Sequence, residues 1–187
     1  MNDREIPAPA LQRILDRQDI YDVLCRYARG VDRGDWELVR STYHPDAHDD
    51  HVEYQGNIDG LIEWLDARFA GVDNSMHFLG NSLVEQTAAD YASAETYFVS
   101  SRLIPPTGDA AVRTSPGDAL CRQAWGRYLD RFERRDGAWR IANRRVVVDA
   151  RFTSVAINGI RTDGTYWGLR NAGDPLYAEH ATLPGRA

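Results

Sequence analysis

Three ionisable side chains lie within apolar patterns of this sequence. Tyr27 and Asp32 occur in the stretch RYARGVDRGDW, which continues an apolar helical stripe, and His77 alternates with leucines in SMHFLGN. Imidazole is well suited to proton abstraction near neutral pH, and a carboxylate or phenol beside it can orient it or polarise a substrate oxygen. These residues indicate acid–base chemistry. The alternative is that Asp32 is an exposed residue at a fraying helix end and His77 a hydrogen-bonded core histidine.

A second group of ionisable residues fills the segment HPDAHDDH, residues 44–51. Histidines and carboxylates at this density suggest a metal site. A metal ion, however, needs ligands that converge in a defined geometry and are themselves held by hydrogen bonds. We expect this run to form a turn that faces water, and we predict no metal site.

The composition excludes several classes of protein. The 187 residues contain no lysine, which rules out Schiff-base chemistry, pyridoxal-phosphate attachment and a P-loop lysine. The net charge of −6 argues against nucleic acid as a partner, because phosphate binding needs clustered cations and the arginines here are interleaved with acids. Cys25 and Cys121 are expected to be buried free thiols. Without a membrane-length apolar run or a signal-peptide pattern, we expect a single cytoplasmic domain that does not bind membranes.

The first part of the chain predicts helices. Apolar residues recur at three- and four-residue steps over 8–32, and the same period appears over 58–71. Residues 35–47 read as a second short helix, which Asp35 caps and which His44-Pro45 ends. The segment 48–56 is short and partly alternating, as in a strand.

From residue 75 the period changes to two. The runs 75–86, 91–104, 119–137 and 138–155 predict long strands, and the Asp-Gly pair in RRDGAW predicts a hairpin between the last two. Three helices followed by a long, curved antiparallel sheet define an α+β fold in which the sheet wraps around the helices and leaves a cavity open at one end.

Over about residues 10–153 the chain resembles the SnoaL-like branch of the nuclear-transport-factor-2-like superfamily. The resemblance rests on the helix YARGVDRGDWELVRSTYHPDA, the segment HDDHVEYQG, the strand start SMHFLGN and the run RYLDRFERRDGAWRIANRRVVVD. It implies a cone-shaped α+β barrel with three N-terminal helices packed in a curved mixed or antiparallel sheet. We therefore expect a cone domain over 1–153 and a C-terminal tail over 154–187 that covers the cavity or a subunit interface.

The resemblance also implies catalytic roles. Members similar to this chain include cofactor-independent lyases with a buried Asp–His pair; Asp32 matches the aspartate, His77 the histidine, and Tyr27 a tyrosine five residues before the aspartate. An aspartate bonded to one ring nitrogen would fix the histidine tautomer and stabilise the imidazolium formed on proton abstraction. On a regular helix Tyr27 and Asp32 project about 140° apart, so both line one pocket only if the helix end is distorted, which Gly30 permits.

Further residues are candidates for substrate binding. The segment DDH before Y-x-G looks like a family pattern whose strand presents His51 or Tyr54 to the cavity. On the last strand, Arg145 and Asp149 share one face, where Arg145 pairs with Asp149 or holds a substrate oxygen. Most aromatic residues are expected in the core, and those that reach the cavity, with Tyr43 and Trp125 as candidates, would suit a flat apolar ligand.

These observations predict a lyase without a cofactor that acts on a bulky hydrophobic, hydroxylated small molecule. The predicted reaction removes water or releases a hydroxymethyl carbon as formaldehyde. An isomerase or cyclase with the same base and a non-catalytic binding protein are the alternatives. Because proteins of this architecture pack through their sheet faces, we expect a homodimer or homotrimer.

Overall fold

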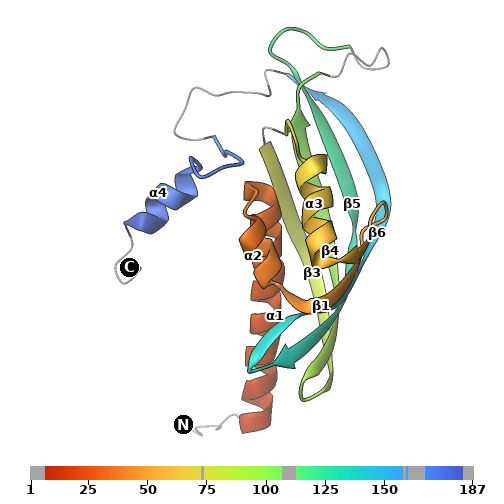
Figure 1. The fold of residues 1–187 in the computed structure, drawn as a ribbon, viewed down its shortest axis with the longest axis vertical. Helices are drawn as coiled ribbons and strands as arrows, with labels where there is room; N and C mark the ends of the chain where they lie inside the picture. The colour runs from red at the N-terminus through yellow and green to blue at the C-terminus, as the bar shows by residue number, and fades with distance from the viewer. Residues whose placement is uncertain (1–6, 73, 107–112, 158, 160–166, 183–187) are drawn as a thin grey trace, which may run out of the picture.

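The computed structural model describes residues 7–72, 74–106, 113–157, 159 and 167–182 of the 187-residue chain. Three helices and two short strands open the chain, four long strands follow, and a last helix lies in the tail (Figure 1). In order, the elements are α1 (Ala8–Arg33), α2 (Trp36–Ser41), β1 (Tyr43–Asp50), β2 (Gln55–Asn57), α3 (Ile58–Arg68), β3 (Asn74–Ala88), β4 (Tyr91–Ile104), β5 (Ala119–Arg135), β6 (Ala138–Ala156) and α4 (Pro175–Ala181).

The six strands form one curved sheet in the order β2-β1-β6-β5-β4-β3. All neighbouring strands are antiparallel except β1 and β6, which run parallel, so the sheet is mixed. The sheet curves around α1, α2 and α3, as Figure 1 shows. The predicted α+β class, with three N-terminal helices in the curve of a mixed sheet, is confirmed.

Helix α1 supplies one side of the core. Its buried apolar residues follow the expected helical spacing and pack against the inner face of the sheet; they are Ile20, Val23, Leu24, Tyr27 and Val31. The helix runs unbroken through Gly30. A Cβ there would lie 2.7 Å from Cγ2 of Val39, so glycine is needed for the close approach of α2 rather than for a distorted helix end.

The second helix is shorter than predicted. Asp35 caps it by accepting a hydrogen bond from the Leu38 amide at 3.0 Å, as expected, but the helix ends at Ser41 and residues 43–50 form β1. The predictions of a helix to residue 47 and of a water-facing turn over 44–51 were wrong, whereas the strand expected over 48–56 is confirmed for residues 48–50. Pairing with β6 satisfies the backbone, and His44 and Asp49 are buried in the strand, which a polar sequence does not reveal.

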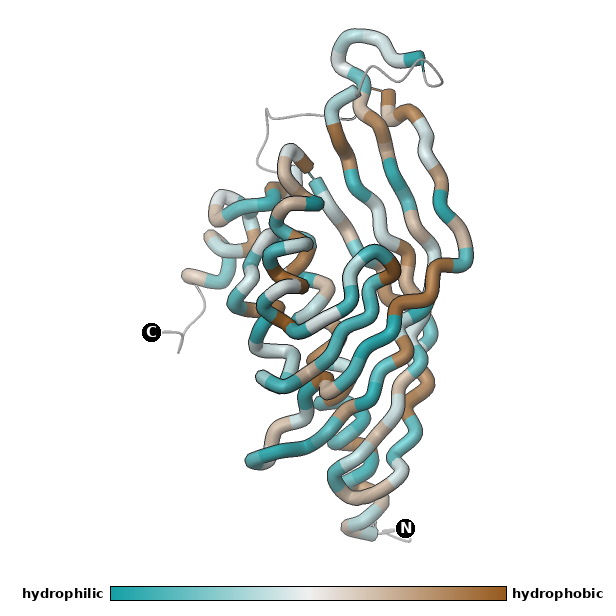
Figure 2. Tube along the Cα trace, turned by 45° about the vertical axis from the view of Figure 1, so that its right-hand side comes forward, coloured by the Kyte–Doolittle hydropathy of each residue, from teal (hydrophilic) through white to brown (hydrophobic). Residues whose placement is uncertain are grey.

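The four long strands follow their predicted ranges closely. Hydrophilic and hydrophobic residues alternate along them (Figure 2), as expected for strands with one face toward the core. Asp136 and Gly137 both adopt positive φ angles, 52° and 77°, and so form the predicted tight hairpin between β5 and β6. Cys121 is partly buried, whereas Cys25 is exposed, contrary to the prediction of buried thiols.

The described part of the tail lies beside the end of α1. The guanidinium of Arg33 pairs with Asp174 at 3.2 Å, Arg170 donates to the carbonyl of Val31 at 3.1 Å, and Asn74 of β3 donates to the carbonyl of Gly168 at 2.7 Å. Residues 158, 160–166 and 183–187 of the predicted tail lie outside the described residues. The tail thus contacts both the end of α1 and the start of β3.

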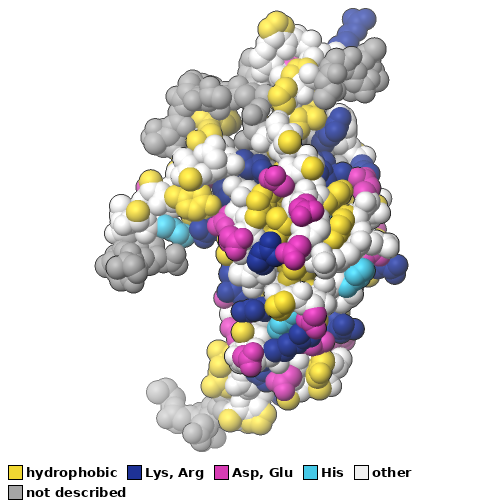
Figure 3. All heavy atoms as spheres, viewed as in Figure 1, with side chains coloured by type: hydrophobic (Ala, Val, Ile, Leu, Met, Phe, Trp, Pro, Cys, Tyr) yellow, Lys and Arg dark blue, Asp and Glu magenta, His cyan; other side chains and the backbone are white. Residues whose placement is uncertain are grey.

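The outer surface mixes charges of both signs. Acidic and basic side chains are interspersed over α2 and α3 on the face shown in Figure 3. None of the described helices is long and apolar enough to cross a membrane.

Candidate active site

Asp32 and His77 meet where the end of α1 packs against the start of β3. Oδ1 of Asp32 accepts hydrogen bonds from Nδ1 of His77 at 2.7 Å and from the hydroxyl of Ser75 at 2.8 Å. Its Oδ2 accepts from the backbone amide of His77 at 2.7 Å. Both side chains are largely buried. The structure therefore brings together the two residues that the sequence analysis paired.

This contact fixes the tautomer of the His77 ring. An ionised carboxylate can only accept hydrogen bonds, so Nδ1 must carry the proton that it donates to Asp32. In the neutral ring the other nitrogen, Nε2, then has a free lone pair. Because His77 lines the cavity of the cone, this lone pair is the group able to take a proton from a bound molecule.

The surroundings of Asp32 keep it ionised. Burial by itself would raise the pKa of Asp32, but the charge of His77 and the hydrogen bonds from His77 and Ser75 hold the pKa below its usual value. A helix C-terminus disfavours a carboxylate, so these donors must offset the helix dipole as well. Asp32 can therefore stabilise an imidazolium at His77.

The cavity has a volume of about 380 Å³, which is within the range of small-molecule sites. Its lining combines residues of α1, the β1–β2 connection, α3 and β3 to β6. The lining residues include Tyr27, His51, Glu53, Arg68, His77, Phe98, Ser100, Arg102, Arg122, Tyr128, Val146 and Arg151.

Tyr27 lines the cavity without any distortion of α1. The curved sheet contacts this helix on two sides: Asp32 reaches β3, while the ring of Tyr27 meets Tyr128 of β5 at 5.7 Å between centroids. Burial raises the pKa of Tyr27 above its ordinary value, against the opposing charge of Arg144. Its hydroxyl thus stays protonated and can donate a hydrogen bond.

Arg144 packs against the rings of Tyr27 and Tyr128. Its guanidinium carbon lies 4.2 Å from the ring centroid of Tyr27 and 4.1 Å from that of Tyr128, within cation–π range. It also donates to both oxygens of Asp130 at 2.7 Å, and both side chains are fully buried. Although burial disfavours its charge, the carboxylate of Asp130 holds the pKa of Arg144 above its usual value. This pair fixes the rings at the cavity floor.

Sequence reasoning assigned no role to Arg144. A signal was present, because Arg144 alternates with Val146 and Val148, and Asp130 alternates with Tyr128 and Phe132, each on a face that is otherwise apolar. A buried cation on one strand and a buried anion on the next can form an ion pair only if the strand register places them opposite each other. The observed register places Asp130 opposite Arg144.

His51 also lines the cavity and belongs to a second His–Asp contact. Its Nδ1 lies 3.2 Å from Oδ1 of Asp49, and its ring lies 5.2 Å from that of Trp64. Asp49 is buried and accepts a further hydrogen bond at 2.7 Å from the hydroxyl of Tyr43. Tyr43 is therefore a buried support for the Asp49–His51 contact rather than a residue of the cavity wall.

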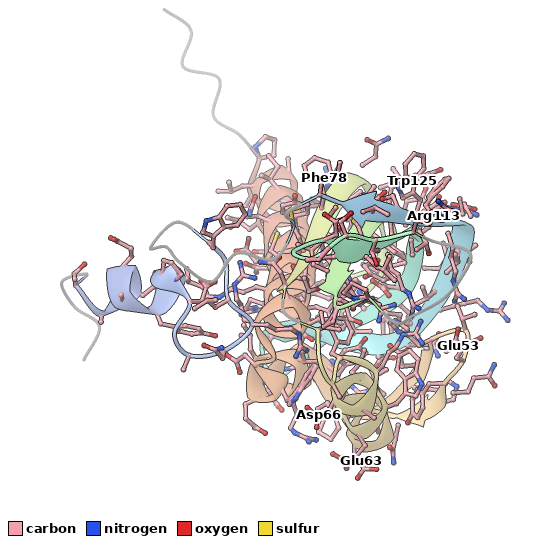
Figure 4. The ribbon with its side chains drawn as sticks, turned by 90° about the horizontal axis from the view of Figure 1, so that it is seen from above. Glu53, Glu63, Asp66, Phe78, Arg113 and Trp125 are labelled. Atoms are coloured by element: carbon pink, nitrogen blue, oxygen red, sulfur yellow. The ribbon has the colours of Figure 1, made fainter. Side chains whose placement is uncertain are left out.

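The three other predicted binding residues lie away from the cavity. Tyr54 donates to the carbonyl of Asn57 at 2.6 Å and stacks on Trp64. Trp125 is 47% exposed on the outer face of the sheet, where Figure 4 shows it with Phe78 on the opposite side of the molecule from Asp66 of α3.

Arg145 is exposed and pairs with Asp50 at 3.2 Å. The alternative pairing with Asp149 is wrong, because Asp149 lies beside Arg127. Tyr43, Tyr54, Trp125 and Arg145 are not lining residues of the cavity, which does not fit the prediction that they contact substrate directly. No three His, Cys, Asp or Glu side chains of the described residues converge as a metal ion would require.

The curved mixed sheet, the helices in its curve and the buried Asp32–His77 contact at a cavity define a cone-shaped α+β fold. The model of the SnoaL-like domain matches residues 12–145, and the chain belongs to this family. No curated protein matches the sequence.

Several solved structures have a similar fold. One is a type 2 hexachlorocyclohexane dehydrochlorinase with a TM-score of 0.68 and 16% identity, covering 82% of this chain and 99% of that one. The type 3 enzyme from Novosphingobium barchaimii has a TM-score of 0.67 and 17% identity, covering 81% and 98% of the two chains. A scytalone dehydratase-like protein from Novosphingobium aromaticivorans has a TM-score of 0.61 and 13% identity, covering 80% and 92%. At these identities the likeness shows a common fold.

Proposed function

We propose that this protein is a lyase that uses no cofactor and acts on a bulky, largely apolar, hydroxylated molecule. The observation that carries the proposal is the Asp32–His77 contact, which leaves Nε2 of His77 as a base in a cavity of about 380 Å³. The names of the similar structures, dehydrochlorinases and a dehydratase-like protein, support the choice of an elimination.

In the proposed elimination, Nε2 of His77 accepts a proton from a carbon atom of the substrate. The electron pair of the broken C–H bond forms a double bond to the neighbouring carbon, whose C–O bond breaks. The departing hydroxide takes the proton back from the imidazolium and leaves as water, so His77 returns to its starting form. Asp32 stabilises the imidazolium, and Tyr27 donates a hydrogen bond to the departing oxygen.

A related reaction starts from the same base. If His77 removes the hydroxyl proton of a hydroxymethyl group, the O–H electron pair forms the C=O bond of formaldehyde as the C–C bond breaks, and the carbon that keeps the C–C electron pair takes the proton back from the imidazolium. The substrate decides between the two reactions, since the base and its geometry serve both. His51, which lines the same cavity, is proposed to contact the substrate.

A mass-spectrometric screen tests this proposal. Purified protein without added metal or cofactor is incubated with hydroxylated and hydroxymethylated aromatic and steroid-like compounds, beside His77→Ala and the control His48→Ala, whose side chain is exposed on β1. We expect a product lighter by water or formaldehyde with the wild type and the control, and none with His77→Ala.

Two results would contradict the lyase. Deuterium uptake from heavy water without a change of composition would indicate an isomerase or cyclase. Tight binding by both wild type and His77→Ala, with no reaction in either, would indicate a non-catalytic binding protein.

We also propose that the outer face of the sheet joins subunits. Phe78, Val99, Trp125 and Ala150 form one cross-strand row over β3 to β6, and Phe78 is 65% exposed. Met76, Tyr97 and Phe152 are other exposed apolar residues on these strands. Such a contiguous apolar surface is typical of a subunit interface.

The division into a cone over 1–153 and a covering tail over 154–187 stays a prediction.

A further inference from the structure

Four arginines of the cavity lining form a cluster that the proposed reaction does not use. We call Arg68 of α3, Arg102 of β4, Arg122 of β5 and Arg151 of β6 the arginine cluster. It is unusual in a chain whose net charge is −6. Positive charge is thus concentrated at a cavity while the rest of the chain carries a net negative charge.

The cluster has too few acidic partners. Glu53 is the one acidic residue among the described lining residues, and it pairs with both Arg68 and Arg151. In the described part of the chain, neither Arg102 nor Arg122 takes part in an ion pair or a side-chain hydrogen bond to an acid. Among the described residues, at least two of the positive charges at the cavity therefore have no ion-pair partner of their own.

Arg102 and Arg122 lie directly opposite each other in the β4–β5 register. Like charges at such a position destabilise a sheet. Burial, followed by repulsion from the other three arginines of the cluster, lowers the pKa of Arg102 to about 10. This arrangement lowers the stability of the protein, and a bound anion would offset the repulsion between the two arginines.

Aromatic rings hold two members of the cluster in place. The guanidinium carbon of Arg102 lies 5.1 Å from the ring centroid of Phe69, and that of Arg68 lies 4.9 Å from the centroid of Trp64. Stacking of this kind limits the conformations of a long side chain before a ligand arrives. Arg68 and Arg102 are therefore held in place at the cavity, whereas Arg122 and Arg151 are exposed.

The sheet register relates the cluster to the candidate base. His77 pairs with Ser100, and Arg102 is the next residue of β4 on the same face. Two residues along a strand span roughly 7 Å. An acid group held between Arg102 and Arg122 would thus lie a few bonds away from an atom that reacts at His77.

We propose that Arg102 and Arg122 bind an anionic oxygen group, a carboxylate or a phosphate, of the substrate, whose apolar body lies against Phe98 and Tyr128. Guanidinium groups match both anions because their planar N–H donors bind two oxygens at once. The inference rests on the proposed function in taking the ligand of this cavity as the substrate. It changes the expected substrate from a purely hydrophobic molecule to an organic anion.

Three probes of the same shape test the inference: 2-naphthoate, 2-naphthyl phosphate and the neutral 2-naphthalenemethanol. Their dissociation constants are measured by calorimetry for wild type, Arg102→Gln, Arg122→Gln and the control Arg131→Gln, an exposed arginine of β5. We expect the wild type and the control to bind an anionic probe roughly tenfold or more tightly than the alcohol. Each cluster variant should lose most of this preference, and added salt should weaken binding of the anion only.

The two anionic probes identify the acid group. Tighter binding of 2-naphthoate indicates a carboxylate, and tighter binding of 2-naphthyl phosphate indicates a phosphate. The inference is overturned if the alcohol binds as tightly as both anions, or if the double variant Arg102→Gln/Arg122→Gln keeps the preference. Thermal melting shows whether the variants fold; relief of the repulsion should leave the melting temperature unchanged or higher.

Repeating the titrations in His77→Ala separates this inference from the proposed reaction. Preference for the anion in that variant, together with no turnover by wild type in the screen, would refute the lyase and retain the anion site. Turnover of neutral compounds without any anion preference would retain the lyase and refute the anion site.

Discussion

The carboxylate of Asp32 holds His77 at two points, the ring and the backbone. Oδ1 accepts from Nδ1 at 2.7 Å, and Oδ2 accepts from the backbone amide at 2.7 Å. This double contact joins the end of α1 to β3, so the packing of helix on sheet sets the direction of Nε2. The geometry is built into the fold before any substrate binds.

Replacing Asp32 with Asn should lower turnover by roughly 10²–10⁴-fold, the range expected for a general base that loses its orientation. The affinity for substrate should change little, because Asp32 does not line the cavity. Steady-state kinetics on any substrate found in the screen checks this. Asp19→Asn, at an exposed position of α1, is the control, and equal turnover by the two variants would refute the role of Asp32.

The lowered pKa of Asp32 predicts how stability depends on pH. A carboxylate whose pKa is lower in the folded state stabilises the fold above its unfolded pKa of about 3.9, and this stabilisation is lost as the pH falls through the folded-state pKa. The difference in free energy of unfolding between wild type and Asp32→Asn should therefore shrink below about pH 4. Urea denaturation over a pH series measures it; a difference that grows on acidification would show the opposite sign of the shift.

Tyr27→Phe should lower turnover by about 10²-fold, the effect of removing one hydrogen bond to a developing negative charge. The fold should persist, because phenylalanine keeps the ring against Arg144. Since the pKa of Tyr27 is raised, its ionisation should not limit the rate near neutral pH. Tyr91→Phe, at an exposed position, is the matched control, and unchanged turnover in Tyr27→Phe would remove the hydroxyl from the mechanism.

Arg144→Met should cost about 3–5 kcal/mol in free energy of unfolding, because it leaves Asp130 buried without a partner. The neighbouring Arg145→Met removes an exposed arginine and should cost at most about 1 kcal/mol. Combining Arg144→Met with Asp130→Leu should recover most of the loss. Equal losses in the two single variants, measured by urea denaturation, would show that the buried pair does not support the cavity floor.

Light scattering should give a native mass of two or three chains for the wild type, and a lower mass for Phe78→Ser or Trp125→Ser. Both residues are exposed apolar positions of the same cross-strand row. Leu15→Ser, at an exposed position of α1, should leave the mass unchanged. A monomeric wild type would refute the proposed interface.

Periodicity predicted most of the fold, because a helix or strand with one buried face repeats its apolar residues at a fixed step. Periodicity did not predict the whole of the strand over residues 43–50. Tyr43 and Asp49 are buried through a hydrogen bond to each other, and β1 is held by pairing with β6, so the strand has no apolar repeat to detect.

The candidate site was predictable only in part for a related reason. The contact between Asp32 and His77 could be predicted, because each residue lies in a short recognisable sequence motif. The pairing of Arg144 with Asp130, and the apposition of Arg102 and Arg122, depend on strand register. One sequence shows which residues share a face but not which residue of the next strand lies opposite.

Nitrogen NMR of the His77 ring at neutral pH tests the central claim most directly, because it reads the protonation of each ring nitrogen. We expect Nδ1 to carry the proton and Nε2 to be unprotonated in the wild type, and a mixture of tautomers in Asp32→Asn. A wild-type ring protonated at Nε2, or the same tautomer in both proteins, would show that Asp32 does not prepare His77 to act as a base.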